Sequence, residues 1–290
     1  MKKYIIISLV VTLLFSCTTD RKKAYEHYLK AKELVKQGDI KNAFAEIDNA
    51  IALDSTNLDF QIVKAQINYE ADNYEEAISI LKGLLSKNFK ADTVNYRIGA
   101  YYFEHGMHFY RQNEITKANE AFEKATIYYN YAINKNIKYY NAYVEKQRAL
   151  HNLKRYDEAL VVINTALKLF PDEIILIGTR GIEKIYLGDL TGALTDLNQA
   201  IESDKLDSTK IATAYRFRGN LYIEKDNFDQ AIMDYTRAIE YDPKDELALY
   251  NRALCYQEKG LKDKACEDFR KAAELGYIKA YKIIKEYCND

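Results

Sequence analysis

The sequence predicts an all-α solenoid, because one short pattern recurs along the whole chain. The pattern is an alanine, a large apolar residue four positions after it and a second alanine seven positions after the first. It is found seven times in the 290 residues, and in one copy another residue replaces the second alanine. Residues spaced in this way lie on one face of a helix. Copies such as those at Ala43 and Ala77, or at Ala231 and Ala265, start 34 residues apart. That period fits two helices and their turns, and a unit of this size buries its apolar face only against its neighbours.

The helix that carries the alanines is the second of each unit. A residue that tolerates the left-handed conformation, mostly Gly, Asp or Asn, precedes the first alanine by five positions. Leu84 replaces the second alanine in one copy, and the only two prolines of the chain, Pro171 and Pro243, end the helix in two others. The first alanines are Ala43, Ala77, Ala118, Ala159, Ala193, Ala231 and Ala265, and the turn residues before them are Gly38, Asp72, Asn113, Lys154, Gly188, Asp226 and Gly260.

The repeated unit resembles the tetratricopeptide repeat family. Residues 214–245, AYRFRGNLYIEKDNFDQAIMDYTRAIEYDPKD, carry the family pattern most completely. The resemblance covers residues 24–290 and implies a right-handed superhelix of about seven helix-turn-helix repeats with a C-terminal capping helix. It also implies a concave groove that binds a protein or peptide partner. The motif positions are filled by Tyr215, Gly219, Tyr222, Ala231, Tyr235, Ala238 and Pro243.

The third repeat, residues 92–139, is longer than the others. Ala118 lies 41 residues from the first alanine on either side, so the repeat is extended by two heptads. Because seven residues are close to two helical turns, the extra segment, residues 106–119, is expected at the tip of a lengthened helical hairpin. The apolar side chains at this tip are expected either to be exposed to a partner or to pack back on the hairpin. They are Met107, Phe109 and Tyr110, and the residues on which they would pack are Ile115 and Phe122.

The N-terminus is a different kind of segment. Two lysines are followed by an apolar run, residues 4–15, which has the layout of a secretory signal and is too short to span a bilayer comfortably. Residues 14–17, LFSC, resemble the lipobox of bacterial lipoproteins. The resemblance implies that residues 1–16 are removed, that Cys17 is lipidated and that residues 17–23 are the lipidated cysteine and a short linker. A plain secretory signal and an uncleaved anchor are the alternatives.

Lipidation of Cys17 would leave three cysteines. An oxidising periplasm would permit a disulfide between Cys266 and Cys288. The alternative, which we favour from the sequence, is that both are small buried hydrophobes of the core. The sequence leaves the choice open.

Other chemistry has little support in the sequence. The formal net charge is −1 and no basic stripe appears, so we expect no nucleic-acid partner. His105 and His108 have no third ligand at metal-site spacing, and no phosphate loop or nucleophile motif is present. We therefore expect a protein that is not an enzyme and that needs no metal or cofactor.

One subfamily of the repeat family binds terminal carboxylates of acidic peptides with basic and Asn side chains on successive first helices. The resemblance assigns these roles to Arg216, Asn220, Asn251 and Lys285, although Tyr281 stands where a second basic residue belongs. The alternative is that these are solvated groove residues.

From these observations we expect a protein-binding scaffold or assembly factor. Lipid on Cys17 would hold it in the bacterial cell envelope, and Thr18 resembles sorting to the outer membrane, facing the periplasm. The competing hypotheses are a structural spacer and an accessory subunit of a cell-envelope enzyme complex.

Overall fold

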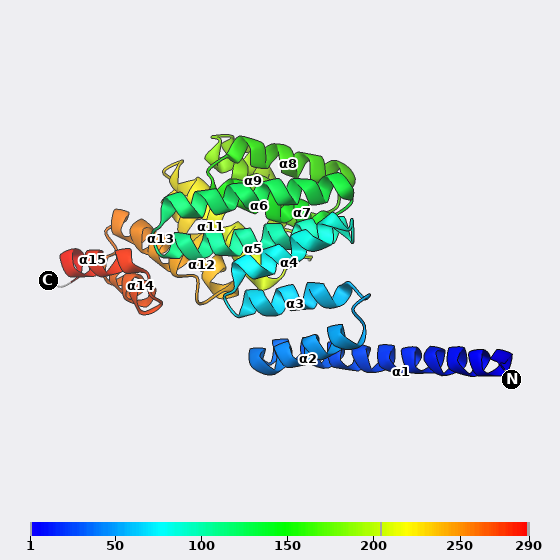
Figure 1. The fold of residues 1–290 in the computed structure, drawn as a ribbon. Helices are drawn as coiled ribbons and strands as arrows, with labels where there is room; N and C mark the ends of the chain where they lie inside the picture. The colour runs from blue at the N-terminus through cyan, green and yellow to red at the C-terminus, as the bar shows by residue number, and fades with distance from the viewer. Residues whose placement is uncertain (1, 204, 289–290) are drawn as a thin grey trace. The chain divides into compact units, whose positions relative to one another are not determined.

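The computed structural model describes residues 2–203 and 205–288, with side chains described from residue 19 onward. The signal segment 1–16 and Cys17, both assigned from the sequence, therefore lie outside the residues whose side chains are described. The fold is all-α, and the described residues form fifteen helices in sequential antiparallel pairs (Figure 1). Within them, no helix combines the length and the apolar character needed to cross a membrane.

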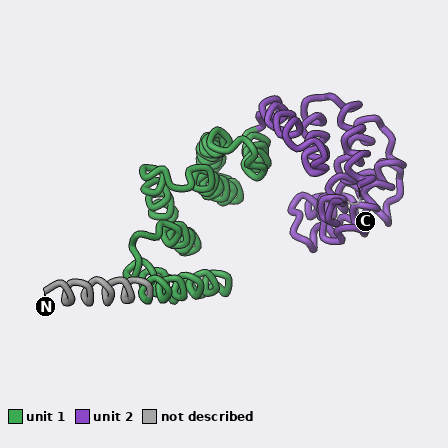
Figure 2. The backbone as a smooth tube through the Cα atoms, turned by 90° about the vertical axis from the view of Figure 1, so that its right-hand side faces the viewer, with its two compact units in different colours: residues 1–153 green, residues 154–290 purple. Residues whose placement is uncertain are grey.

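The chain divides into two compact units, which Figure 2 shows in different colours. Unit 1 is Met1–Leu153 and unit 2 is Lys154–Asp290. Unit 1 contains α1 (Lys2–Lys36), α2 (Ile40–Leu53), α3 (Asp59–Glu70), α4 (Tyr74–Ser86), α5 (Ala91–Arg111), α6 (Ile115–Lys135) and α7 (Tyr140–Asn152). Unit 2 contains α8 (Tyr156–Leu169), α9 (Ile174–Tyr186), α10 (Leu190–Ile201), α11 (Ser208–Ile223), α12 (Phe228–Tyr241), α13 (Glu246–Glu258), α14 (Lys262–Glu274) and α15 (Ile278–Tyr287).

The repeated pattern forms the core of every helix pair. Each first alanine and each large apolar residue after it is fully buried, and the second position is at most 2% exposed even where Leu84 replaces alanine. All seven turn residues have a positive φ, between 53° and 81°. This conformation is confirmed even at Lys154, a residue that rarely adopts it. The pattern therefore specifies both the buried stripe and the turn before it.

The third hairpin contains two close contacts between its helices, one heptad apart. Helices α5 and α6 are both 21 residues long, whereas α3 and α4 have 12 and 13. A Cβ atom at Gly99 would lie 2.7 Å from the ring of Tyr129, and one at Gly106 would lie 2.7 Å from the ring of Phe122. Residues 106–119 contain the end of α5, the turn and the start of α6, so the additional length lies at the tip of the hairpin.

Candidate functional site

Ion pairs between helices hold the first helices of unit 2 in place. In α11, Arg218 donates from Nε and Nη2 to the two carboxylate oxygens of Asp234 in α12, both at 2.7 Å. Its Nη1 atom also donates to Asn198 of the preceding repeat at 2.7 Å. One guanidinium group thus joins three helices. Two other arginines repeat this bidentate pairing, Arg180 with Asp196 and Arg252 with Asp268.

The aspartates of these pairs are almost completely buried. The side chain of Asp196 is 3% exposed, and its carboxylate also pairs with Lys184 at 2.8 Å. Burial alone would raise the pKa of Asp196, but the hydrogen bonds from Arg180 and Lys184 outweigh it and hold the pKa below its usual value. Asp196 is therefore charged and fully paired, and the three arginine–aspartate pairs fix the first helices of unit 2, two of which carry Arg216, Asn220 and Asn251. These pairs were not predicted from the sequence, although the spacing of 16 residues between arginine and aspartate recurs in three repeats.

Two of the groove residues assigned from the sequence meet in unit 2. Asn251 of α13 donates from Nδ2 to Oδ1 of Asn220 in α11 at 3.1 Å, which joins successive repeats. The hydroxyl of Tyr235, fully buried in α12, donates to the same oxygen at 2.7 Å. Burial raises the pKa of Tyr235, so its hydroxyl stays protonated and able to donate. Among the described residues, Nδ2 of Asn220 and Oδ1 of Asn251 have no hydrogen-bond partner, and neither atom is buried.

Arg216 is brought to the same helix face, but its charge is already paired. Its Nε donates to Oδ2 of Asp245 at 2.8 Å, and the two side chains are 16% and 11% exposed. Through Oδ1, Asp245 also caps the N-terminus of α13. The guanidinium lies 4.9 Å from the ring centre of Phe217. A ligand carboxylate at Arg216 would therefore have to compete with a partly buried aspartate.

Lys285 does not join this cluster. It is exposed on α15, and no contact links it to Arg216, Asn220 or Asn251 in the described part of the chain. It stands eight residues after the N-cap Tyr277, whereas Asn251 stands six after the equivalent N-cap of α13. Counted from the N-cap, Lys285 therefore lies two positions further along its helix than Asn251, and its peptide-binding role stays a prediction.

The tip of the third hairpin exposes fewer apolar groups than expected. Met107 and Phe109 are partly buried against the core of the hairpin, and Lys117 Nζ lies 5.3 Å from the ring centre of Phe109. Tyr110 is 52% exposed, and Ile115 is 44% exposed. Only Tyr110 of the three assigned residues thus offers a largely exposed aromatic surface.

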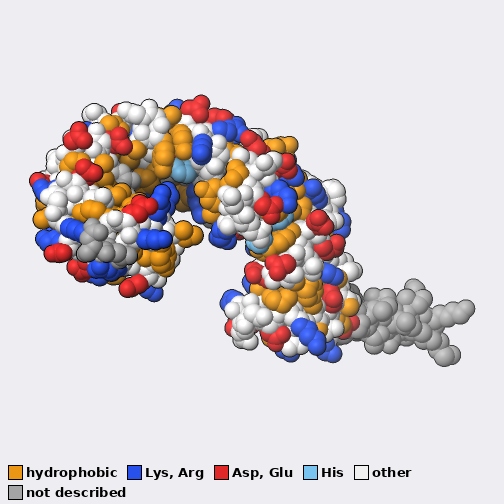
Figure 3. Space-filling model, turned by 90° about the vertical axis from the view of Figure 1, so that its left-hand side faces the viewer, with side chains coloured by type: hydrophobic (Ala, Val, Ile, Leu, Met, Phe, Trp, Pro, Cys, Tyr) orange, Lys and Arg blue, Asp and Glu red, His pale blue; other side chains and the backbone are white. Residues whose placement is uncertain are grey.

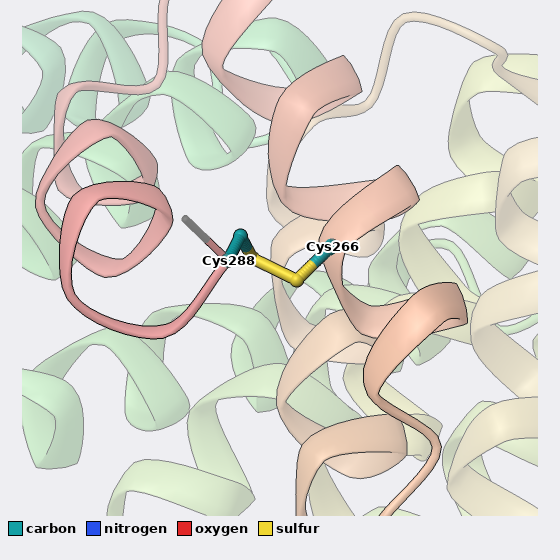
Figure 4. Close-up of a disulfide and its surroundings, with 2 residues drawn as sticks. All are labelled: Cys266 and Cys288. Carbon is teal, nitrogen blue, oxygen red and sulfur yellow. A yellow bond between two sulfur atoms is a disulfide. The ribbon is translucent and has the colours of Figure 1, made fainter. Parts of the chain in front are cut away.

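The C-terminal cysteines form a disulfide, shown in Figure 4 between Cys266 and Cys288. The preference for two free thiols drawn from the sequence was wrong in this structure. The physical reason is that α15 folds back along α14, which brings the two Cα atoms to 5.7 Å, within the range that a disulfide spans. Cys255 is a free cysteine, and burial raises its pKa to about 11.

The surface has no continuous region of one charge on the face shown in Figure 3, where basic and acidic side chains are interspersed with hydrophobic ones. In the part of the chain with described side chains, no group of three His, Cys, Asp or Glu residues is placed to hold a metal ion.

Family models match three parts of the chain. Residues 219–260 match the model described as TPR repeat, and residues 247–275 the one described as tetratricopeptide repeat. Residues 9–84 match the model described as anaphase-promoting complex, cyclosome, subunit 3. The C-terminal matches include Gly219, Asn220 and Asn251 and identify the helix pairs of this region as tetratricopeptide repeats.

Known proteins match this chain over different shares of their own length. Tetratricopeptide repeat protein 13 of Homo sapiens is 28% identical over 140 residues, which cover 48% of this chain and 16% of that protein. A tetratricopeptide repeat protein of Parabacteroides merdae has a solved structure that matches with a TM-score of 0.68 and 19% identity, over 92% of this chain and 100% of that chain. Yeast Tom70 matches with a TM-score of 0.58 and 18% identity, over 93% of this chain and 55% of that chain. The chain spans less than half the length of its first curated relatives, and the structural matches at these identities show the fold alone.

Proposed function

We propose that this tetratricopeptide-repeat protein is a scaffold that binds an extended segment of a partner protein along the first helices of unit 2, while lipid on Cys17 holds it in the bacterial cell envelope. The first part of the proposal rests on the groove side chains of α11 and α13. The second rests on the sequence LFSC before residue 18 and on the disulfide of unit 2.

The observation that carries the binding proposal is the pair Asn220 and Asn251. Together they present one unused amide donor and one unused carbonyl acceptor, on two side chains that are hydrogen-bonded to each other across successive repeats. A peptide group needs one acceptor and one donor, so it can pair with both. The hydrogen bond from the Tyr235 hydroxyl fixes the orientation of the Asn220 amide. Because the Asn220–Asn251 pair is preformed, it loses little conformational freedom when a ligand binds.

This geometry favours recognition of a peptide backbone over recognition of a terminal carboxylate. Arg216 is engaged by Asp245, and Lys285 is exposed on a different helix, α15. We therefore propose Asn220 and Asn251 as the peptide-binding residues and Arg216 as the group that orders the start of α13. Binding of a free carboxylate that is lost when the peptide is amidated would favour the carboxylate site instead.

The binding test is a selection of random displayed peptides against residues 18–290. Substitution Asn220→Asp keeps the oxygen that Tyr235 needs but removes the free Nδ2 donor, so selected peptides should bind about tenfold more weakly. Asn251→Ala should have a similar effect. The matched control is Asn164→Ala, because Asn164 is an exposed asparagine on α8. Failure to enrich any peptide, or equal affinity of all three variants, would reject the groove proposal.

The anchoring proposal is tested separately by Cys17→Ser. The parent protein should incorporate labelled fatty acid and fractionate with membranes, whereas the variant should remain unprocessed or become soluble. The same membrane fractionation for both, without fatty acid in the parent, would show that Cys17 is not the attachment point.

Supporting evidence for an oxidising compartment comes from the other end of the chain. Stable structural disulfides are rare where thiols are kept reduced, and common in the periplasm and outside the cell. The Cys266–Cys288 bond therefore supports export of this protein independently of residues 1–17.

A further inference from the structure

The outward face of α15, the last described helix, combines exposed apolar and basic side chains. Ile278 is 81% exposed and Tyr281 is 57% exposed. Exposed apolar side chains that lie close together mark interaction surfaces more often than isolated ones do. Three lysines lie on the same side of the helix, and none forms an ion pair with a described residue. They are Lys279, Lys282 and Lys285.

The preceding repeat shows what normally covers this face. Tyr281 stands four residues after the N-cap of α15, as Leu249 does in α13. Leu249 is only 3% exposed. No described helix covers Tyr281 in the same way. The residues packed with Leu249 belong to the two following helices and are Ala272, Ala273 and Ala280.

The position of Lys285 restricts what can bind. It stands eight residues after the N-cap of α15, where α13 has Ala253. Ala253 is completely buried, because the second helix of that repeat approaches closely there. A closely packed helix of the ordinary repeat type therefore does not fit over Lys285. A second copy of the same face is also disfavoured, because it would oppose lysines to lysines.

The helix is held rigidly by two links to α14. The disulfide joins Cys288 to Cys266, and the hydroxyl of Tyr281 donates to the carbonyl oxygen of Ala273 at 2.9 Å. A surface fixed in this way loses little conformational freedom on binding.

We propose that the outer face of α15 is a docking surface for an acidic helical segment of a partner protein. The three lysines recur every third residue, which spaces them by about 4.5 Å along the helix axis. Acidic side chains three or four residues apart on a partner helix have nearly the same spacing and can pair with them. Ile278 and Tyr281 supply the apolar contact beside this row. The surface is separate from Asn220 and Asn251, and its occupancy does not depend on peptide binding in the groove.

The test uses the full chain in its own cells, with a photo-crosslinking amino acid in place of Ile278. The matched control carries the same group in place of Val161, a 66% exposed residue of α8. Charge reversal K279E/K282E/K285E should reduce the adduct formed from position 278 by about tenfold or more, because three attractive pairs become repulsive. The control reversal, K41E/K82E/K168E, changes exposed lysines on other helices and should leave the adduct unchanged.

Mass spectrometry of the adduct decides between occupants. The proposal requires a segment of another protein with Asp or Glu three or four residues apart in a helical pattern. An adduct to lipid, an adduct to a second copy of this chain, or a yield no higher than from position 161 would overturn it. So would an adduct that survives K279E/K282E/K285E unchanged. Circular dichroism and an intact disulfide establish that each variant is folded.

Discussion

Reduction of the Cys266–Cys288 disulfide is expected to release α15 while leaving the preceding repeats folded. Apart from the bond, α15 is held by one small buried side chain, Ala280, which packs against α13 and α14, by partly buried apolar groups and by one hydrogen bond from Tyr281 to α14. Repeat arrays are stabilised mainly by contacts between neighbours, so a terminal helix can detach locally.

The size of the effect follows from the length of the closed loop. The two cysteines are 22 residues apart in sequence, and closing a loop of this length removes unfolded-state entropy worth about 3 kcal/mol at 25 °C. That free energy corresponds to about a hundredfold change in the ratio of docked to detached α15. Because α15 packs on α13 and α14 and on no later described helix, the loss should be concentrated in residues 278–288.

Hydrogen exchange measured by mass spectrometry provides the assay. Amides of α15 should exchange about a hundredfold faster in the reduced protein, and in the variant C266A/C288A, than in the oxidised protein. The control is Cys255→Ala, because Cys255 is buried and its raised pKa keeps the thiol unreactive. That variant must retain the difference between oxidised and reduced protein. Equal protection of α15 in both redox states, with the bond state verified by mass, would refute the reasoning.

Three further predictions concern the repeats. Gly219→Ala should lower the free energy of unfolding by about 1–3 kcal/mol, because the new Cβ would lie 2.8 Å from the ring of Tyr235. Gly83→Ala should raise the free energy of unfolding by about 0.5–1 kcal/mol, because no atom lies within 4 Å of the new Cβ. Urea denaturation measures both changes. Asp196→Asn should cost about 2 kcal/mol at pH 7. Because the folded-state pKa of Asp196 is lowered, its contribution is present above its unfolded pKa of about 3.9 and is lost as pH falls through the folded value, so the two proteins should converge in acid denaturation. Deletion of residues 106–119 should preserve the helical circular dichroism and cooperative melting of unit 1, and a collapse of either would contradict the placement of these residues at a hairpin tip.

The backbone of the repeats could be read from the sequence because it depends on local, periodic constraints. Residues at i, i+4 and i+7 share a helix face in any helix, and a unit that packs only on its neighbours must bury that face. The position within the repeat even overrides residue preference, since Lys154 adopts the left-handed turn that Gly188 and Gly260 adopt more readily. The extension of the third hairpin could also be predicted from the sequence, because seven-residue insertions preserve the phase of the helix.

The side-chain pairs of the groove could not be read in the same way. The sequence shows that Arg216 and Asn220 stand one helical turn apart. Only the structure shows that Arg216 forms an ion pair with Asp245, while the amide nitrogen of Asn220 remains available to a ligand. Asp245 is recognisable as a helix cap, yet a cap uses one carboxylate oxygen and leaves the other for a partner from any nearby helix. The Arg216–Asp245 pair, unlike the arginine–aspartate pairs 16 residues apart, has no recurring spacing, which is why the carboxylate-site hypothesis assigned a role to Arg216 that its surroundings do not favour.

The disulfide and the exposed face of α15 have a common explanation. Burial alone holds this helix weakly, because Ala280 is its only fully buried side chain. Its outer face also carries Ile278, which is exposed to solvent. A detached α15 would expose still more apolar surface, at the cost of solubility. A bond that keeps the helix docked therefore both keeps this apolar surface covered and holds Ile278 and Tyr281 in a fixed orientation. If the bond served the array alone, a polar outer face would serve equally well, so the retained apolar groups favour a surface that is kept in place in order to bind.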